Sequence, residues 1–165
     1  MENQLFKAKG IYSFELVRDG EVIDAWDETN IVVNGGLDYI LDSALSNGTS
    51  YATHYVVLFS NNYTPIATTV ITDLTQVTTK VTESVRPTWT EAGVTSQSIT
   101  NTASPAAFTF NASETIYGAG LVHGSSTKGD TASTSLMSAS KFTSSRAVIS
   151  GDILNVTYTL TISSS

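Results

Sequence analysis

Three acidic residues surround a tryptophan near the start of the chain: Asp24, Asp27 and Glu28 lie around Trp26. Two carboxylates that flank an aromatic side chain could act as acid and base in glycoside hydrolysis. The other interpretation is a solvated strand edge, where charge discourages pairing with another sheet. We favour the strand edge, and a hydrolase that uses Asp24 with Asp27 or Glu28 is kept as a minor hypothesis.

The remaining candidates for chemistry are weaker. A metal site needs about three or four convergent ligands, whereas His54 and His123 stand alone without a His-x-His or His-x-x-x-His pair. The glycines of residues 118–124 miss the dinucleotide-loop spacing by one residue, and no strand-then-helix context surrounds them. The serines form no Gly-x-Ser-x-Gly motif. We therefore predict no catalytic residue, no metal ligand and no cofactor, and expect that the protein is not an enzyme.

Exposed aromatic side chains could instead form a platform on which sugar rings stack. The candidates for such a platform are Tyr39, Tyr51, Tyr63, Trp89 and Tyr117. Tyrosine and tryptophan also fill cores and oligomer interfaces, which is the interpretation we favour. A glycan-binding or receptor-binding module is thus the alternative function.

The overall composition limits the class of partner. The 165 residues include 8 Lys and Arg against 15 Asp and Glu, which gives a net charge of −7. No basic cluster exists that could bind phosphate backbones or an anionic membrane surface, so we expect neither a nucleic-acid nor a membrane partner. The absence of cysteine excludes a disulfide scaffold. The N-terminal residues lack the apolar core of a signal peptide, so we expect folding in a reducing cytoplasm.

One segment has helical periodicity, residues 34–45. Its apolar residues recur at the spacing of three and four that forms one stripe on a helix; they are Leu37, Ile40, Leu41, Ala44 and Leu45. We expect this stripe to cover an open end or side of a β-sandwich, with Asp38 and Asp42 in solvent. A charged residue at Leu41 should then unfold the domain.

The N-terminal region, residues 1–33, is predicted to be an arm followed by a β-hairpin. Residues 11–17 alternate, and Asp19-Gly20 is a strong signal for a tight turn because glycine accepts positive φ. The return strand extends toward Val33, with a bend at Asp27 and Glu28. The hairpin could project from the rest of the molecule as a docking element.

Short strands and Ser/Thr-rich turns dominate the rest of the chain. Residues 54–59 form an apolar run that indicates a strand covered on both faces, and residues 154–162 alternate with period two. Residues 66–92 fit a helix or a strand with a long loop, and we favour the latter. The further predicted strands are 94–100, 106–110, 115–122, 135–140 and 147–149. This pattern predicts a single mainly β domain, residues 1–165: an antiparallel β-sandwich, jelly-roll-like, with one short helix and the N-terminal hairpin.

Several weak motifs, taken in their order, resemble a family. Residues 30–45, NIVVNGGLDYILDSAL, carry the clearest part. The other stretches are residues 55–59, 62–65, 83–89, 96–110 and 145–162. Together they are similar to small structural proteins of tailed bacteriophages and prophages, across about residues 30–162.

The resemblance implies a head decoration, or cement, protein that binds the outer surface of the capsid and holds neighbouring capsomers together. Its partner would be the major capsid protein, and it would form dimers or trimers at the symmetry axes of the virion. It would be synthesised in the bacterial cytoplasm. A tail-associated module is the alternative location. From the large apolar groups near the N-terminus we predict the partner-contacting residues Leu5, Phe6, Tyr12, Phe14 and Trp26.

Overall fold

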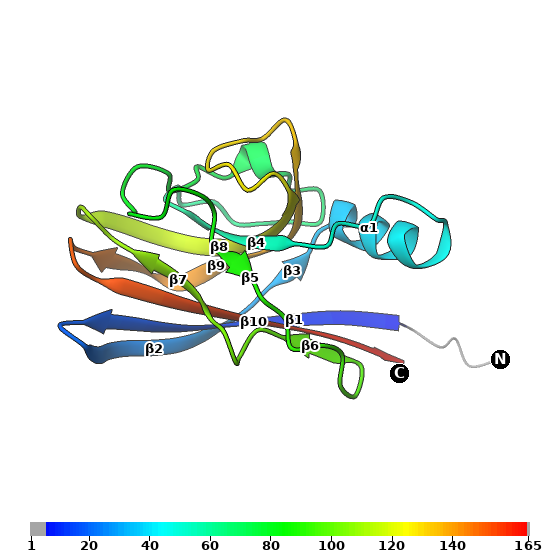
Figure 1. Cartoon of the computed structure of the whole chain (residues 1–165), viewed down its shortest axis with the longest axis horizontal. Helices are drawn as coiled ribbons and strands as arrows, with labels where there is room; N and C mark the ends of the chain where they lie inside the picture. The colour runs from blue at the N-terminus through cyan, green and yellow to red at the C-terminus, as the bar shows by residue number, and fades with distance from the viewer. Residues whose placement is uncertain (1–5, 165) are drawn as a thin grey trace.

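In the computed structural model, which describes residues 6–164, two antiparallel β-sheets form a sandwich-like arrangement (Figure 1). The first sheet has the order β2 (Glu21–Thr29), β1 (Phe6–Arg18), β10 (Ile153–Ser164) and β6 (Ser98–Thr100), with β7 (Ala106–Thr109) also paired to β10. The second sheet has the order β3 (Ile31–Val32), β9 (Thr134–Val148), β8 (Glu114–Gly124), β4 (His54–Phe59) and β5 (Thr88–Trp89). The one α-helix of residues 6–164, α1 (Asn34–Leu45), lies at the end of the sandwich where β1 begins and β10 ends (Figure 1). The predicted mainly β, antiparallel fold with one short helix is confirmed.

The N-terminal hairpin is part of the first sheet. Asp19 and Gly20 both have positive φ, 53° and 83°, as a primed hairpin turn requires. β1 pairs with β2 on one side and with β10 on the other, from Phe6 opposite Ser164 to Val17 opposite Ile153. The hairpin therefore does not project from the sandwich, and residues 1–5 of the predicted arm lie outside the described residues.

The return strand changes sheets at Asn30. β2 ends at Thr29 in the first sheet, and β3 begins at Ile31 in the second. The Asn30 side-chain amide donates to the Tyr158 hydroxyl over 2.9 Å, which ties the crossing to β10. The bend predicted at Asp27 and Glu28 is thus placed two to three residues too early.

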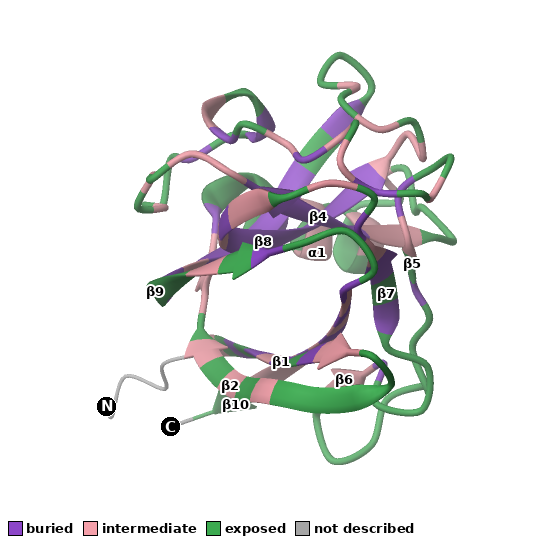
Figure 2. Ribbon diagram, turned by 90° about the vertical axis from the view of Figure 1, so that its left-hand side faces the viewer, coloured by how far each residue is buried: buried purple, intermediate pink, exposed green. Residues whose placement is uncertain are grey.

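The main core fills the space between the sheets, and it is rich in aromatic rings. Tyr12 stacks on Tyr158 with ring centroids 4.4 Å apart, and Phe14 meets the edge of Phe142 at 4.6 Å. The predicted alternation of β10 is confirmed from Leu154 to Tyr158, where Leu154, Val156 and Tyr158 are buried, whereas residues 159–162 are all partly exposed. Figure 2 shows β4 and β8 largely buried, whereas β2 is largely exposed.

A second apolar cluster lies on the outer face of the second sheet. Val57 and Phe59 of β4 pack there with Ile71 and Leu74 of the loop that carries the short 3₁₀-helix η1 (Ile71–Asp73). Val56 and Leu58 point into the main core. The prediction that residues 54–59 are covered on both faces is confirmed, and most of residues 66–92 form the long loop that supplies the cover.

A buried arginine joins the loops above the second sheet. Arg86 is only 2% exposed, and its guanidinium donates to Thr134 Oγ1 and Gln76 Oε1, both over 2.8 Å. It also donates to the main-chain carbonyl oxygens of Ser125 and Asp130. Burial lowers the pKa of Arg86. One side chain therefore connects the loop before β5 to the loop between β8 and β9.

Helix α1 packs on the sandwich with a different face from the predicted one. Its buried residue is Gly36, where a Cβ would overlap the Met137 carbonyl oxygen of β9. Tyr39 and Ile40 pack against the main core. Leu37, Leu41 and Leu45 are 39%, 57% and 80% exposed. The prediction that the apolar stripe covers the sandwich is confirmed for Ile40 and wrong for Leu37, Leu41, Ala44 and Leu45, because close approach requires the glycine side of the helix to face β9. No helix within residues 6–164 has the length and apolar character needed to cross a membrane.

Candidate functional site

The acidic cluster around Trp26 forms a closed seam between β2 and β9. Arg146 of β9 donates from Nε to Asp24 over 2.7 Å, and its guanidinium carbon lies 4.2 Å from the centre of the Trp26 ring. The ring also meets the edge of Phe142 at 5.3 Å. The arginine thus neutralises the carboxylate and covers the aromatic side chain at the same time.

The other two acidic residues do not complete a catalytic pair. Glu28 accepts hydrogen bonds from the Thr143 main-chain N–H over 2.6 Å and from the Thr143 hydroxyl over 2.9 Å. Asp27 is exposed on the opposite face of β2, because successive residues of a strand point to opposite sides. β2 is the outer strand of its sheet, so the strand-edge interpretation agrees with the structure.

The predicted partner-contacting residues are largely internal. Tyr12 and Phe14 are 0% and 2% exposed, and the Tyr12 hydroxyl bonds Ser138 Oγ over 2.8 Å. The prediction is wrong for these two residues, because even-numbered positions of β1 face the core. Trp26 is partly buried beneath Arg146. Phe6 begins β1 opposite Ser164, and Leu5 lies outside the described residues.

The two histidines meet beneath α1. His54 of β4 lies opposite His123 of β8, with ring centroids 6.3 Å apart. Tyr39 of α1 stacks on His123 at 4.1 Å, and Tyr51 approaches the same ring at 4.6 Å. Burial, with a smaller contribution from His54, lowers the pKa of His123 to about 4. Among the described residues no group of three potential ligands could hold a metal ion.

This aromatic cluster attaches the helix to the sandwich. The Tyr51 main-chain N–H donates to the Tyr39 hydroxyl over 2.9 Å, so the loop after α1 closes over the same histidine. His123 Nδ1 is buried without a hydrogen-bond partner in the described structure. Sequence reasoning missed the cluster because its members come from segments far apart in the chain, and only the register of β4 on β8 brings the histidines together.

The five aromatic residues considered for a sugar platform have different surroundings in the structure. Trp89 is 6% exposed, and its Nε1 donates to the Tyr158 carbonyl oxygen over 3.1 Å, so this residue belongs to the core. Tyr39 and Tyr51 are engaged with His123. Tyr63 and Tyr117 are partly buried against the second apolar cluster. Trp89 therefore agrees with the favoured interpretation of a core residue and not with the sugar-platform alternative.

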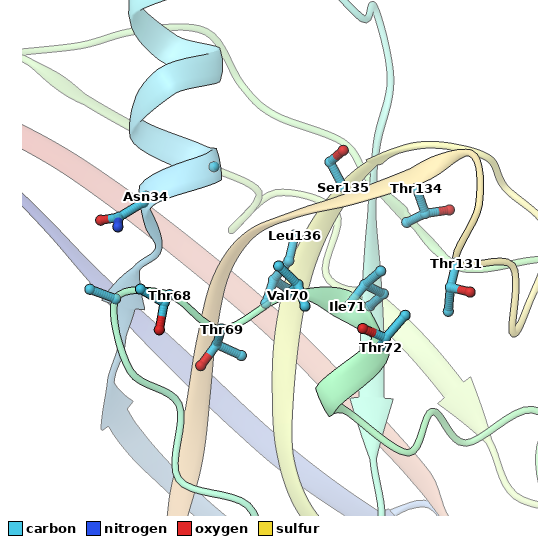
Figure 3. A pocket seen from close by; sticks show the side chains of 12 residues that line it. Asn34, Thr68, Thr69, Val70, Ile71, Thr72, Thr131, Thr134, Ser135 and Leu136 are labelled. Carbon is cyan, nitrogen blue, oxygen red and sulfur yellow. The ribbon is translucent and has the colours of Figure 1, made fainter.

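A pocket of about 440 Å³ lies beside the start of α1 (Figure 3). Threonine and serine hydroxyls line much of it; the labelled ones are Thr68, Thr69, Thr72, Thr131, Thr134 and Ser135. Two of these hydroxyls already have partners, since Thr69 Oγ1 accepts from the Ile66 N–H and Thr134 Oγ1 accepts from Arg86. The lining residues include no ionisable side chain, so this pocket offers no acid or base for catalysis.

The surface best suited to binding is the outer side of α1, which we call the α1 face. It consists of Leu37, Leu41 and Leu45, each four residues apart, with Asp38 and Asp42 beside them. A hollow of about 660 Å³ adjoins it, lined by Leu41, Leu45, both aspartates, Tyr39 and His123, among others. A row of exposed leucines on a rigidly attached helix is typical of a protein-binding surface.

Comparisons with protein-family models, with curated proteins and with solved structures found no match. The described geometry brings together an apolar helix surface and a buried histidine, and it places Asp27 on the opposite face of β2 from Asp24 and Glu28. The arrangement is therefore suited to binding another macromolecule.

Proposed function

We propose that this protein is a structural component of a bacteriophage virion, a decoration protein that binds the outer surface of the capsid and stabilises contacts between capsomers. It acts by binding and not by catalysis. Its partner is the major capsid protein, and it assembles as a dimer or trimer at a symmetry axis. Many modest contacts repeated by symmetry provide the overall affinity.

The observation that carries the proposal is the α1 face. Its leucines are exposed although they form the most regular apolar stripe of the chain. The same segment carries the clearest part of the resemblance to small phage structural proteins. An apolar helix surface that does not stabilise its own domain is explained when a partner covers it. The acidic charge of the whole chain, −7, fits a position outside the shell and away from packaged DNA.

Co-sedimentation with empty capsids tests the proposal. The capsids are assembled from the shell protein encoded near this chain's gene, and the wild-type protein should sediment with them at saturating, symmetry-defined occupancy. Leu41→Glu should reduce binding more than tenfold, because burying an unpaired charge in an apolar contact is costly. Val22→Glu is the matched control. Val22 is 55% exposed and lies next to the β1–β2 turn, at the end of the sandwich away from α1 (Figure 1).

Electron microscopy of the virion separates the head from the tail. Density for this protein on the capsid exterior supports the proposal, whereas density confined to the tail supports the tail-associated alternative. Wild-type protein that fails to bind capsids, together with virions that lack it on the head, would overturn the assignment.

A further inference from the structure

The α1 face combines apolar side chains with acidic charge that the molecule itself does not neutralise. Arg18 and Arg146 form the two ion pairs within residues 6–164, and their partners are Asp152 and Asp24. Asp38 and Asp42 are exposed and take part in neither. The residues that line the adjoining hollow include no Lys or Arg. Asp42 accepts a hydrogen bond from the Ser46 hydroxyl, but no basic side chain within residues 6–164 neutralises either carboxylate beside Leu41 and Leu45.

A buried polar atom of one residue that lines the hollow also lacks a partner. His123 is 7% exposed, its ring lines the hollow, and its Nδ1 is buried without a hydrogen bond in the described structure. The neighbouring groups around this ring are Tyr39 and Tyr51 on the α1 side and His54 on β4. A neutral imidazole has one acceptor nitrogen and one donor N–H, and leaving either of them buried and unpaired costs free energy.

We infer that the α1 face binds an amphipathic basic segment of a partner protein, with apolar side chains packed on Leu37, Leu41 and Leu45 and Lys or Arg side chains at Asp38 and Asp42. Charge complementarity selects this occupant over a second copy of the chain. A two-fold contact between two α1 faces would place four aspartates in one interface, and like charges placed together disfavour the wrong partner. The inference rests on the proposed function for the identity of the partner, the shell subunit, but its chemistry can be tested without one.

The first experiment uses a defined probe, a 14-residue helical peptide of leucine and lysine, and its counterpart with glutamate in place of lysine. Amide chemical shifts of the full-length protein are followed during titration in 50 mM and 500 mM NaCl. The lysine peptide should perturb residues of α1 and His123, and the glutamate peptide should not. The higher salt concentration should weaken binding severalfold, since it screens exposed charge pairs.

Matched variants test whether the charge acts at this site. Asp38→Asn with Asp42→Asn should weaken the lysine peptide roughly fivefold, as the loss of two exposed ion pairs predicts. Asp19→Asn with Glu21→Gln removes the same charge from the exposed hairpin turn and should change affinity less than twofold. An equal loss in both double variants, equal binding of the glutamate peptide, or shift changes centred on another surface would overturn the inference.

The capsid assay separates this inference from the proposed function. If Leu41→Glu abolishes capsid binding while the aspartate variants and salt have no effect, the partner is apolar but not basic, and only the inference fails. If the peptide results are as expected and the protein does not bind capsids, the basic partner stands and the virion assignment fails.

Discussion

Two regions of this molecule place carboxylates beside large apolar side chains. The regions differ in whether a basic side chain of the same chain pairs with those carboxylates. At the seam between β2 and β9, Asp24 is paired with Arg146, and the same guanidinium covers Trp26. On the α1 face, Asp38 and Asp42 have no ion-pair partner in residues 6–164, and Leu41 is 57% exposed. At the seam, both the charge and the apolar side chain are covered by Arg146. On the α1 face, the leucines are exposed and the carboxylates lack a basic partner within residues 6–164.

The difference shows why residue type alone does not identify a binding site. The seam has the more suggestive composition, because two acids around a tryptophan resemble a glycosidase site. Its neighbours neutralise it: Arg146 and Thr143 of β9 satisfy Asp24 and Glu28. What distinguishes the α1 face is that no basic side chain within residues 6–164 pairs with its carboxylates, and this property depends on the packing of distant segments.

The largest expected difference between the regions is in stability. Phe14→Ala, beside the seam, should lower the free energy of unfolding by about 3–5 kcal/mol, because Phe14 is 2% exposed and contacts both Trp26 and Phe142. Leu41→Ala on the α1 face should change it by less than about 1 kcal/mol, because truncating an exposed side chain leaves no cavity. Urea denaturation of both variants measures the difference, and equal losses would show that the α1 face is structural.

Acid should destabilise the protein at the contact between α1 and His123. The pKa of His123 is about 6.5 in an unfolded chain but about 4 in the folded protein, where burial disfavours its charge. Between these values the unfolded state binds more protons, so stability should fall by up to about 2–3 kcal/mol as the pH drops from 7 to 4. Burial also lowers the pKa of His54, which acts in the same direction.

Denaturation at pH 7.5 and at pH 4.5 measures this loss, and amide hydrogen exchange should show faster opening of α1 at the lower pH. His123→Gln removes the titration and should flatten the pH dependence. An unchanged dependence in that variant would assign the effect to other groups.

The ion pair and the cation–π contact of the seam should together contribute about 1–2 kcal/mol to stability. Arg146→Ala removes an ion pair and a cation–π contact that are both partly exposed, each contributing about 0.5–1 kcal/mol. It also uncovers the Trp26 ring, so tryptophan emission should shift to longer wavelength. Arg146→Lys keeps the charge and should recover only part of the stability, since lysine lacks the planar group that stacks.

The smallest effect is expected from the acids of α1. Asp38→Asn or Asp42→Asn should leave stability within about 0.5 kcal/mol of the wild type, with a slight increase, because like charges four residues apart on a helix repel. Thermal unfolding of the single variants checks the sign. A clear loss of stability would mean that these carboxylates have an internal role comparable to that of Asp24.

Local patterns predicted much of the strand framework. The alternation of residues 154–162 identified β10, and Asp19-Gly20 identified the hairpin turn because both residues must adopt positive φ. The segments predicted at 135–140 and 147–149 are one strand, β9, which stays continuous through serines and threonines that a sequence pattern takes for a turn. Serine and threonine occur in strands and in turns, so the pairing of this segment with β8 determines that it is a strand.

The face of α1 that packs on the sandwich could not be predicted from the periodicity of its apolar residues. The hydrophobic stripe of an isolated helix normally marks the buried side, whereas here its three leucines are exposed and only Ile40 packs on the core. The helix instead approaches β9 through Gly36 and is held by Tyr39 on His123. The same limit applies to Tyr12 and Phe14, whose burial follows from the strand pairing of β1 and not from their position near the N-terminus.

The buried guanidinium of Arg86 has a consequence for proteolysis. Long irregular connections are normally the first segments that proteases cleave, but this side chain holds the loops before β5 and after β8 through hydrogen bonds to Gln76, Thr134 and two carbonyl oxygens. Neither loop can extend into a protease active site without breaking those bonds. Limited digestion with a broad-specificity protease should therefore begin in residues 46–53, which follow α1 and are mostly exposed. The nicked chain would keep both sheets, and its helix would become the first part of the molecule to separate.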